Sequence, residues 1–281
     1  MSKLPQFTGL MAPAFTPFDD RNQIKLDLVE PYAQLLKLKG ISAVLVNGTT
    51  GEGMLLSVDE RKKITEKWSE VCKKLDMLLM VQVAGCAVID TVDLAKHAAS
   101  LKVDGVLCLP ELYFKPKTIE KLVSYLKGIA VHCQDIPLYY YHIPVYTQVD
   151  LPMPSFMELA RREIPTFTGI KYSSGDLEKG VSCLKHGQVF IGSNTIWIAA
   201  VALGFTCAIM TPLNVKPEFS LSIIKLMGEG KVVEARKQQM LLNDFVRKTL
   251  ENGNGELGAS MKISFNENFK SLSLGPTRKP L

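Results

Sequence analysis

The chain alternates between short apolar stretches and longer amphipathic stretches up to about residue 211. The apolar stretches have the length of strands, and those between them carry apolar residues at helical spacing. Strands that alternate with helices form parallel sheets, and eight such pairs favour an α/β fold, the closed (β/α)8 TIM barrel. The expected strands span residues 9–16, 42–46, 78–84, 105–109, 138–141, 168–171, 189–191 and 207–211.

Start and stop signals support the helices between these strands. Ser57 and Glu60 form a capping box at the start of a helix that runs to about residue 75, and Gly40 ends the helix before it. An open, doubly wound sheet is the alternative fold. It is disfavoured because no Gly-x-Gly-x-x-Gly follows the first strand.

The chain continues well beyond the eighth strand. Residues 219–227, 231–250 and 258–265 again have helical periodicity. We therefore expect a barrel over residues 1–215 and a C-terminal helical extension over residues 216–281, packed on the barrel as one structural unit. With 281 residues, of which 47% are hydrophobic, the chain can bury a sizeable core.

Composition excludes several classes of partner. The net charge of +5 is mild and the lysines are scattered among acids, which indicates a solvated surface and no nucleic-acid groove. No Cys-x-x-Cys pair occurs, so we expect reduced thiols in a cytoplasmic protein, and no histidine spacing suggests a metal. Residues 1–7 lack a signal-peptide core, and no apolar run is long enough to span a membrane.

One lysine stands at the carboxyl end of an expected strand. Residues 166–171 are rich in β-formers and end in Lys171, and residues 173–176 then read as a turn and a helix N-cap. Burial of a lysine favours its neutral amine, which attacks a carbonyl carbon to form a Schiff base. The alternative is an edge-strand lysine that faces water.

The loop after the second strand has the composition of a small anion site. Gly48 allows a ligand to approach the backbone, and the hydroxyls of Thr49 and Thr50 can hold a carboxylate. A dinucleotide phosphate suits the loop less well, because the lysine of a P-loop is absent. An ordinary strand-to-helix turn explains the same residues equally well.

The fifth strand carries three consecutive tyrosines, Tyr139, Tyr140 and Tyr141. Alternation places Tyr139 and Tyr141 on one side of the strand and Tyr140 on the other. A phenol near a lysine can relay a proton, although all three can equally be core aromatics with satisfied hydroxyls. A lysine, a phenol and an anion-holding loop together suit reversible carbon–carbon bond chemistry on a 2-keto acid, with the protonated imine as electron sink.

Three motifs stand in the order and spacing of the pyruvate-dependent class I aldolases, the N-acetylneuraminate lyase and dihydrodipicolinate synthase family. They are Gly48-Thr49-Thr50-Gly51-Glu52, Tyr141-His142-Ile143-Pro144 and Gly169-Ile170-Lys171. The resemblance runs from about residue 9 to residue 214 and more loosely into the C-terminal helices. Within the family, the chain is most similar to the animal type of N-acetylneuraminate lyase.

The resemblance implies roles for individual residues. Lys171 becomes the Schiff-base former, Tyr141 the proton relay, and Thr49 and Thr50 the binders of the pyruvate carboxylate, while Ser173 falls where the family places a small hydroxyl residue near the substrate.

The resemblance also implies the partners of the chain. The ligand is pyruvate or another 2-keto acid, with no cofactor, and the assembly is a homotetramer in which Tyr113, an accessory candidate, lies close to a subunit interface.

The chain departs from the lyases on the side that binds the sugar. Lyases typically have Gly-x-Asp-Glu after the seventh strand, and here Gly192-Ser193-Asn194-Thr195 stands there. The eighth strand of lyases usually ends in Gly-Ser, whereas this one ends in Met210-Thr211. Tyr146 and Gln148 replace a typical leucine and a typical glycine. The candidate substrate-binding residues on this side are Gly192, Asn194, Thr195 and Thr211, with Tyr146 and Met210 as accessory candidates.

These departures leave three hypotheses. The first is a retro-aldol lyase that cleaves a sialic acid-like 2-keto acid to pyruvate and an aldehyde sugar. The second is an aldolase for a different 2-keto-3-deoxy acid, and the third is a pyruvate-binding protein with little turnover. Dihydrodipicolinate synthesis is disfavoured, because the arginine that usually follows the Tyr-x-x-Pro motif is replaced by Val145-Tyr146-Thr147.

Overall fold

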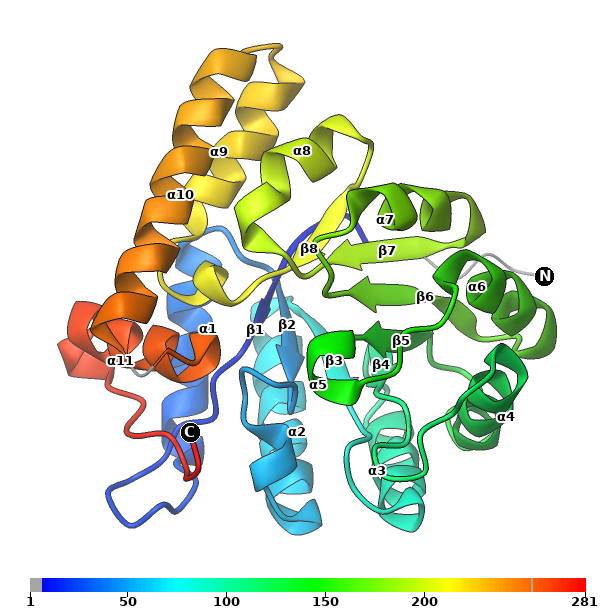
Figure 1. Ribbon diagram of the computed structural model, residues 1–281. Helices are drawn as coiled ribbons and strands as arrows, with labels where there is room; N and C mark the ends of the chain where they lie inside the picture. The colour runs from blue at the N-terminus through cyan, green and yellow to red at the C-terminus, as the bar shows by residue number, and fades with distance from the viewer. Residues whose placement is uncertain (1–6, 254) are drawn as a thin grey trace.

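Eight parallel strands close into a barrel in the computed structural model, which describes residues 7–253 and 255–281 (Figure 1). The strands follow one another around the barrel in sequence order, and the last pairs with the first. This confirms the predicted (β/α)8 fold. The prediction about a signal peptide concerns residues 1–7, and residues 1–6 lie outside the described part. The strands are β1 (Gly9–Pro13), β2 (Ala43–Val46), β3 (Leu78–Gln82), β4 (Gly105–Cys108), β5 (Leu138–His142), β6 (Phe167–Tyr172), β7 (Gln188–Ile191) and β8 (Cys207–Ile209).

The apolar runs in the sequence extend beyond several strands. The sequence predicts strands over residues 9–16 and 78–84, but in the structure these strands end at residues 13 and 82. Ala14 and Val83 remain buried, and each still donates one backbone hydrogen bond to the next strand. The apolar pattern reports burial, which continues after the regular ladder has ended.

Helices cover the outside of the barrel between the strands (Figure 1). The capping box at Ser57 is confirmed, because Glu60 N donates to Ser57 Oγ and Ser57 N donates to the Glu60 carboxylate. The sequence pattern does not predict the one-turn helix α5, which begins at a proline whose fixed φ suits the first turn. The helices are α1 (Val29–Leu38), α2 (Val58–Leu75), α3 (Val88–Ser100), α4 (Ile119–Ala130), α5 (Pro144–Thr147), α6 (Met153–Glu163), α7 (Leu177–Cys183) and α8 (Trp197–Ala202).

Three further helices follow the barrel, as the periodicity predicts: α9 (Pro217–Gly228), α10 (Val232–Asn252) and α11 (Leu257–Asn268). Figure 1 shows α9 and α10 side by side beyond α8, and α11 beside α1. Two short 3-10 turns after strands meet this group: η4 (Asn194–Ile196) contacts α10, and η5 (Thr211–Asn214) contacts α9 and α11. The extension therefore reaches the loops at the carboxyl ends of β7 and β8. The division of the chain at residue 215 stays a prediction.

Two other findings concern the cysteines and the helices of the described residues. All six cysteines are free thiols. Among residues 7–253 and 255–281, no helix combines the length and apolarity needed to cross a membrane.

Candidate active site

Lys171 lies near the carboxyl end of β6, where its side chain is only 4% exposed. In the sheet it pairs with Tyr141 on β5 and with Phe190 on β7. Its Nζ donates a hydrogen bond to Tyr141 Oη at 3.0 Å and lies 4.1 Å from the centre of the Tyr141 ring. The predicted burial of this lysine is confirmed, and the alternative of an edge-strand lysine facing water is excluded.

Tyr141 connects this lysine to the loop after β2. Its hydroxyl lies 3.3 Å from Thr49 Oγ1. Burial raises the pKa of Tyr141, but the charge of Lys171 and hydrogen bonds with Lys171, Thr49 and Ser173 outweigh burial, so the pKa lies below its ordinary value. A phenol of lowered pKa releases a proton more readily near neutral pH, as a proton relay requires.

The three tyrosines of β5 alternate as predicted. Tyr139 donates a hydrogen bond to Gln188 Oε1 at 2.9 Å, and because β7 is not adjacent to β5, this contact crosses the barrel interior. Tyr140 packs on Phe156 of α6, outside the barrel. Tyr139 is thus a core aromatic with a satisfied hydroxyl, and of the three only Tyr141 meets Lys171.

The loop after β2 brings two threonine hydroxyls to different neighbours. Thr49 reaches Tyr141, while Thr50 Oγ1 lies 2.9 Å from Thr211 Oγ1, which follows β8. The turn needs glycine at residue 53, because a Cβ there would lie 1.9 Å from the Asn47 carbonyl oxygen. Strands β2, β5, β6 and β8 therefore deliver Lys171, Tyr141 and three threonine hydroxyls, those of Thr49, Thr50 and Thr211, to one end of the barrel.

Ser173 and Gly192 lie side by side after β6 and β7. A Cβ at residue 192 would lie 2.2 Å from Ser173 Oγ, so the missing side chain of Gly192 makes room for that hydroxyl. Ser173 N donates to the His142 carbonyl, which keeps the end of β6 paired with β5. These two predicted site residues thus belong to the same region as Lys171.

The turn that replaces the usual pair of acids is held by α10. The Asn194 carbonyl accepts a hydrogen bond from Gln239 Nε2 at 2.9 Å, and the Thr195 carbonyl accepts one from Asn243 Nδ2 at 3.2 Å. Asn194 is buried and Thr195 is exposed. Met210, which follows β8, is fully buried. Side chains of a helix in the extension therefore hold the backbone of this turn in place.

Tyr146 on α5 meets a residue that sequence reasoning missed. Its hydroxyl donates to Glu256 Oε2 at 3.1 Å, and Glu256 is the N-cap residue of α11. Burial, followed by the Glu256 charge, raises the pKa of Tyr146. Gly258 lies close to the Thr50 backbone, so the start of α11 lies against the loop after β2. The only sequence signal over α11 is helical periodicity, which does not mark Glu256.

Tyr113 lies apart from these residues. It is 83% exposed, and its ring meets that of Phe114, also 83% exposed, at 5.0 Å. Among the described residues, Tyr113 takes no part in the hydrogen bonds that join Lys171, Tyr141 and Thr49.

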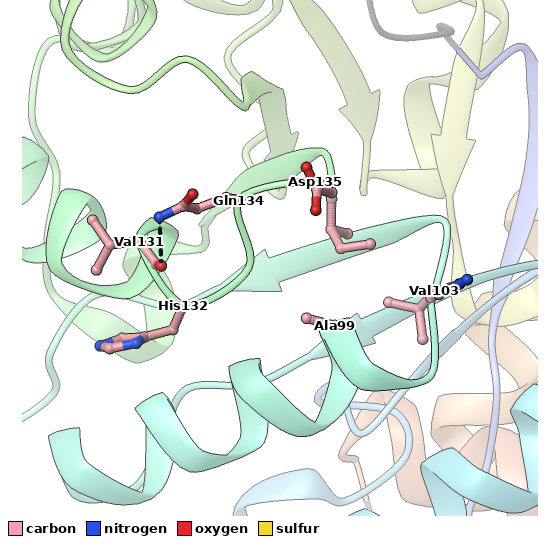
Figure 2. A pocket seen from close by; sticks show the side chains of 8 residues that line it. Ala99, Val103, Val131, His132, Gln134 and Asp135 are labelled. Carbon is pink, nitrogen blue, oxygen red and sulfur yellow. Dashed lines mark hydrogen bonds between the residues drawn. The ribbon is translucent and has the colours of Figure 1, made fainter.

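Two hollows differ in their relation to the site. A cavity of about 240 Å³ adjoins Thr49 and Tyr146 and is lined mostly by apolar side chains, among them Leu109 and Ile143. A cleft of about 610 Å³ lies at the other end of the barrel, before the start of β4 and β5 (Figure 2). The carboxyl ends of barrel strands carry active sites, so the first hollow and the residues beside it form the candidate site. The cleft is lined by Ala99, Lys102, Val103, Val131, His132, Gln134, Asp135 and Ile136.

Comparisons with known proteins agree on one family. A model of the dihydrodipicolinate synthetase family matches residues 6–266. An N-acetylneuraminate lyase of Danio rerio is 31% identical, over 99% of this chain and 92% of the relative. The native structure of the N-acetylneuraminate lyase (sialic acid aldolase) of Aliivibrio salmonicida has a TM-score of 0.92 at 29% identity, covering 99% of this chain and 91% of that one. A sialic acid aldolase of Ruminococcus gnavus, solved as a catalytic lysine mutant, has a TM-score of 0.89 at 25% identity, covering 98% and 89%.

Proposed function

The chain belongs to the dihydrodipicolinate synthetase family, and we propose that it is a class I aldolase that cleaves a sialic acid-like 2-keto acid to pyruvate and an aldehyde sugar. The observation that carries the proposal is the buried amine of Lys171, 3.0 Å from a phenol whose pKa is lowered. The similarity to N-acetylneuraminate lyases supports it, as does the catalytic lysine of the Ruminococcus gnavus enzyme.

Lys171 supplies the covalent chemistry. Its neutral amine attacks the C2 carbonyl of the keto acid to form a carbinolamine. The Tyr141 phenol then protonates the departing hydroxyl, so that water leaves and a protonated imine and the Tyr141 phenolate remain. The C4 hydroxyl then gives its proton to the Tyr141 phenolate as the C3–C4 bond breaks, and the electron pair of that bond moves into the imine. An aldehyde and an enamine result. Protonation of the enamine at C3 and hydrolysis of the imine release pyruvate and restore the amine.

The loop after β2 binds the carboxylate in this proposal. Thr49 and Thr50 present hydroxyl donors, and Gly48 leaves the backbone open to the ligand. Two observations support the assignment: Thr49 Oγ1 lies 3.3 Å from Tyr141 Oη, and Thr50 Oγ1 lies 2.9 Å from the hydroxyl of Thr211, which follows β8. The carboxylate is thereby bound next to the carbon that Lys171 attacks.

The distal side favours a substrate tail that differs from N-acetylneuraminate. We propose that Asn194, Thr195, Tyr146 and Glu256 contact this tail and that Met210 limits its size. An amide both donates and accepts hydrogen bonds, whereas a threonine is shorter than a glutamate and reaches less far. For this reason an aldolase for a different 2-keto-3-deoxy acid remains the second candidate.

Assembly and location are part of the same proposal. We propose a homotetramer in the cytoplasm, without cofactor or metal. The exposed aromatic pair of Tyr113 and Phe114 is the kind of surface that protein interfaces cover. Six free thiols suit a reducing compartment.

Borohydride trapping tests the proposal. Incubation with pyruvate and borohydride should add one reduced pyruvate adduct to the wild-type chain, read by mass spectrometry. Lys171→Ala should abolish the adduct while the protein stays folded. Lys62→Ala, which removes a surface lysine paired with Asp93, is the matched control and should trap normally. Trapping by Lys171→Ala at the wild-type level would refute the mechanism.

A panel of 2-keto acids then separates the three hypotheses. Pyruvate release from a sialic acid-like substrate supports the lyase. Release only from a keto acid with a shorter or less polar tail favours the second candidate. Trapping without release from any substrate indicates the pyruvate-binding protein.

A further inference from the structure

A buried ion pair lies directly behind the loop that carries Thr49 and Thr50. Glu52, two residues after Thr50, is 3% exposed and adopts a left-handed backbone conformation with φ of 59°. Its Oε1 lies 2.8 Å from Nζ of Lys262, which is on α11 and 1% exposed. Two opposite charges are thus removed from water beside a candidate binding loop.

All three donors of the Lys262 ammonium are used. Besides Glu52, the ammonium donates to the carbonyls of Thr16 and Pro276, each at 2.7 Å, and it lies 4.4 Å from the centre of the Phe18 ring. Burial lowers the pKa of Lys262, and the Glu52 carboxylate opposes this effect. One side chain therefore joins the loop after β1, the loop after β2 and the segment after α11.

The other oxygen of Glu52 holds the C-terminal segment. Glu52 Oε2 accepts the backbone N–H of Arg278 at 2.8 Å. The Arg278 guanidinium donates to both carboxylate oxygens of Glu60 on α2 and to the Leu55 carbonyl. Residues 274–281, which we call the C-terminal strap, are thus bonded to the loop after β2 and to the helix that follows it.

The network is tied directly to the threonines. Thr16 Oγ1 donates to the carbonyl of Gly51 at 2.6 Å, and Gly51 separates Thr50 from Glu52. A left-handed conformation is unfavourable for a residue with a side chain, and it persists only where the surroundings enforce it. Here the two carboxylate oxygens of Glu52 provide that restraint.

We infer that Glu52, Lys262 and Arg278 are positioning residues that hold Thr49 and Thr50 in place to receive the substrate carboxylate. The inference rests on the proposed function. None of the three residues touches the Lys171 amine in the hydrogen-bond network, so they act on carboxylate binding and not on imine chemistry. A role in stability alone is a weaker explanation, because buried ion pairs are often replaced by apolar residues without loss of stability.

Glu52→Gln perturbs the network with little change in shape. A glutamine amide has one oxygen and one NH2 group, whereas Glu52 receives one donor on each of its oxygens. In either orientation the NH2 group must face the Lys262 ammonium or the Arg278 N–H. One restraint on the loop is therefore lost.

The readout is borohydride trapping as a function of pyruvate concentration. A shift of the Thr49 and Thr50 hydroxyls by up to about 1 Å weakens pyruvate binding. Glu52→Gln should therefore raise the half-saturating pyruvate concentration about ten-fold. The extent of trapping at saturating pyruvate should stay at the wild-type level. Arg278→Ala should raise the half-saturating concentration a few-fold, since the backbone N–H to Glu52 remains. Lys262→Arg should bind pyruvate better than Lys262→Met, because it keeps the positive charge.

Controls separate the inference from general destabilisation and from the proposed function. Lys67→Met removes an exposed ion pair with Glu70 on α2 and should leave pyruvate binding unchanged. Folded Glu52→Gln and Arg278→Ala proteins with wild-type half-saturation would overturn the inference. If Glu52→Gln does not fold, Arg278→Ala and Lys262→Met are judged by the same criterion. Absence of trapping in the wild type would refute the proposed function instead. Hydrogen exchange over residues 47–56 then decides the inference, with faster exchange expected in the variants and unchanged exchange contradicting it.

Discussion

Replacement of Tyr141 by phenylalanine removes one oxygen atom from the centre of the candidate site. That oxygen accepts a hydrogen bond from Lys171 at 3.0 Å and lies 3.3 Å from Thr49 Oγ1. Phenylalanine keeps the ring in its buried position between the same neighbours. The substitution therefore tests the proton relay without opening a cavity.

The magnitude follows from the role of the hydroxyl. A positioned acid–base group contributes about 10²–10⁴-fold to kcat, which corresponds to roughly 3–5 kcal/mol of transition-state stabilisation. Without the phenol, water can supply the single proton that imine formation needs, whereas cleavage needs a positioned base at the C4 hydroxyl. We therefore expect kcat for cleavage to fall by about 10²–10⁴-fold, while borohydride trapping with pyruvate persists.

The assay is pyruvate release under saturating substrate, with trapping measured on the same samples. Tyr140→Phe is the matched control: it changes the neighbouring tyrosine on the opposite side of β5, whose hydroxyl has no hydrogen-bond partner among the described residues. Tyr140→Phe should leave kcat unchanged. An unchanged kcat in Tyr141→Phe would refute the relay by Tyr141 and leave water as the proton carrier.

Two other perturbations address the distal side and the pH dependence of stability. The protein should cleave N-acetylneuraminate weakly or not at all, measured as pyruvate release, while trapping pyruvate normally. If Met210 leaves room, Asn194→Asp with Thr195→Glu should raise kcat/KM for that sugar by up to roughly 10²–10⁴-fold. Efficient cleavage by the unmodified protein would contradict this assignment. Burial lowers the pKa of His142 to about 4, so the folded protein binds fewer protons than the unfolded chain between about pH 4 and 6.5. The free energy of unfolding, measured with urea, should therefore fall by roughly 3 kcal/mol from pH 7 to pH 4, and His142→Gln should show a smaller fall.

The sequence predicts the barrel because its signals are periodic and repeated. Buried parallel strands read as apolar runs, and eight alternations leave few competing topologies. The ends of the strands are less predictable, since residues such as Ala14 and Val83 stay buried after the ladder ends. Helix α5 has four residues, too few to show a period.

The core of the candidate site is predictable for a related reason. The carboxyl ends of all barrel strands meet at one face, so residues at those positions converge whatever their separation in the sequence. Lys171 and Tyr141 are directly paired in the sheet, and Thr49 follows β2. Their proximity follows from topology, although the 3.0 Å contact itself requires the structure.

The residues behind the site follow no such rule. Lys262 lies on a helix where lysines ordinarily face water, and its partner Glu52 is 210 residues away in the sequence. Glu256 is likewise joined to Tyr146 across 110 residues. No local period or capping signal encodes which helix of the extension packs on which loop, so these contacts require the folded chain.

The residues that carry the proposed chemistry lie on strands, whereas the residues proposed to select the substrate lie on a loop. Lys171 and Tyr141 belong to adjacent strands and are held by the ladder, which few substitutions can shift. Asn194 and Thr195 lie on a turn whose carbonyls are held by side chains of α10, so their own side chains can change without moving that turn. Substitutions at these two positions should therefore alter the preferred keto acid while imine formation at Lys171 continues.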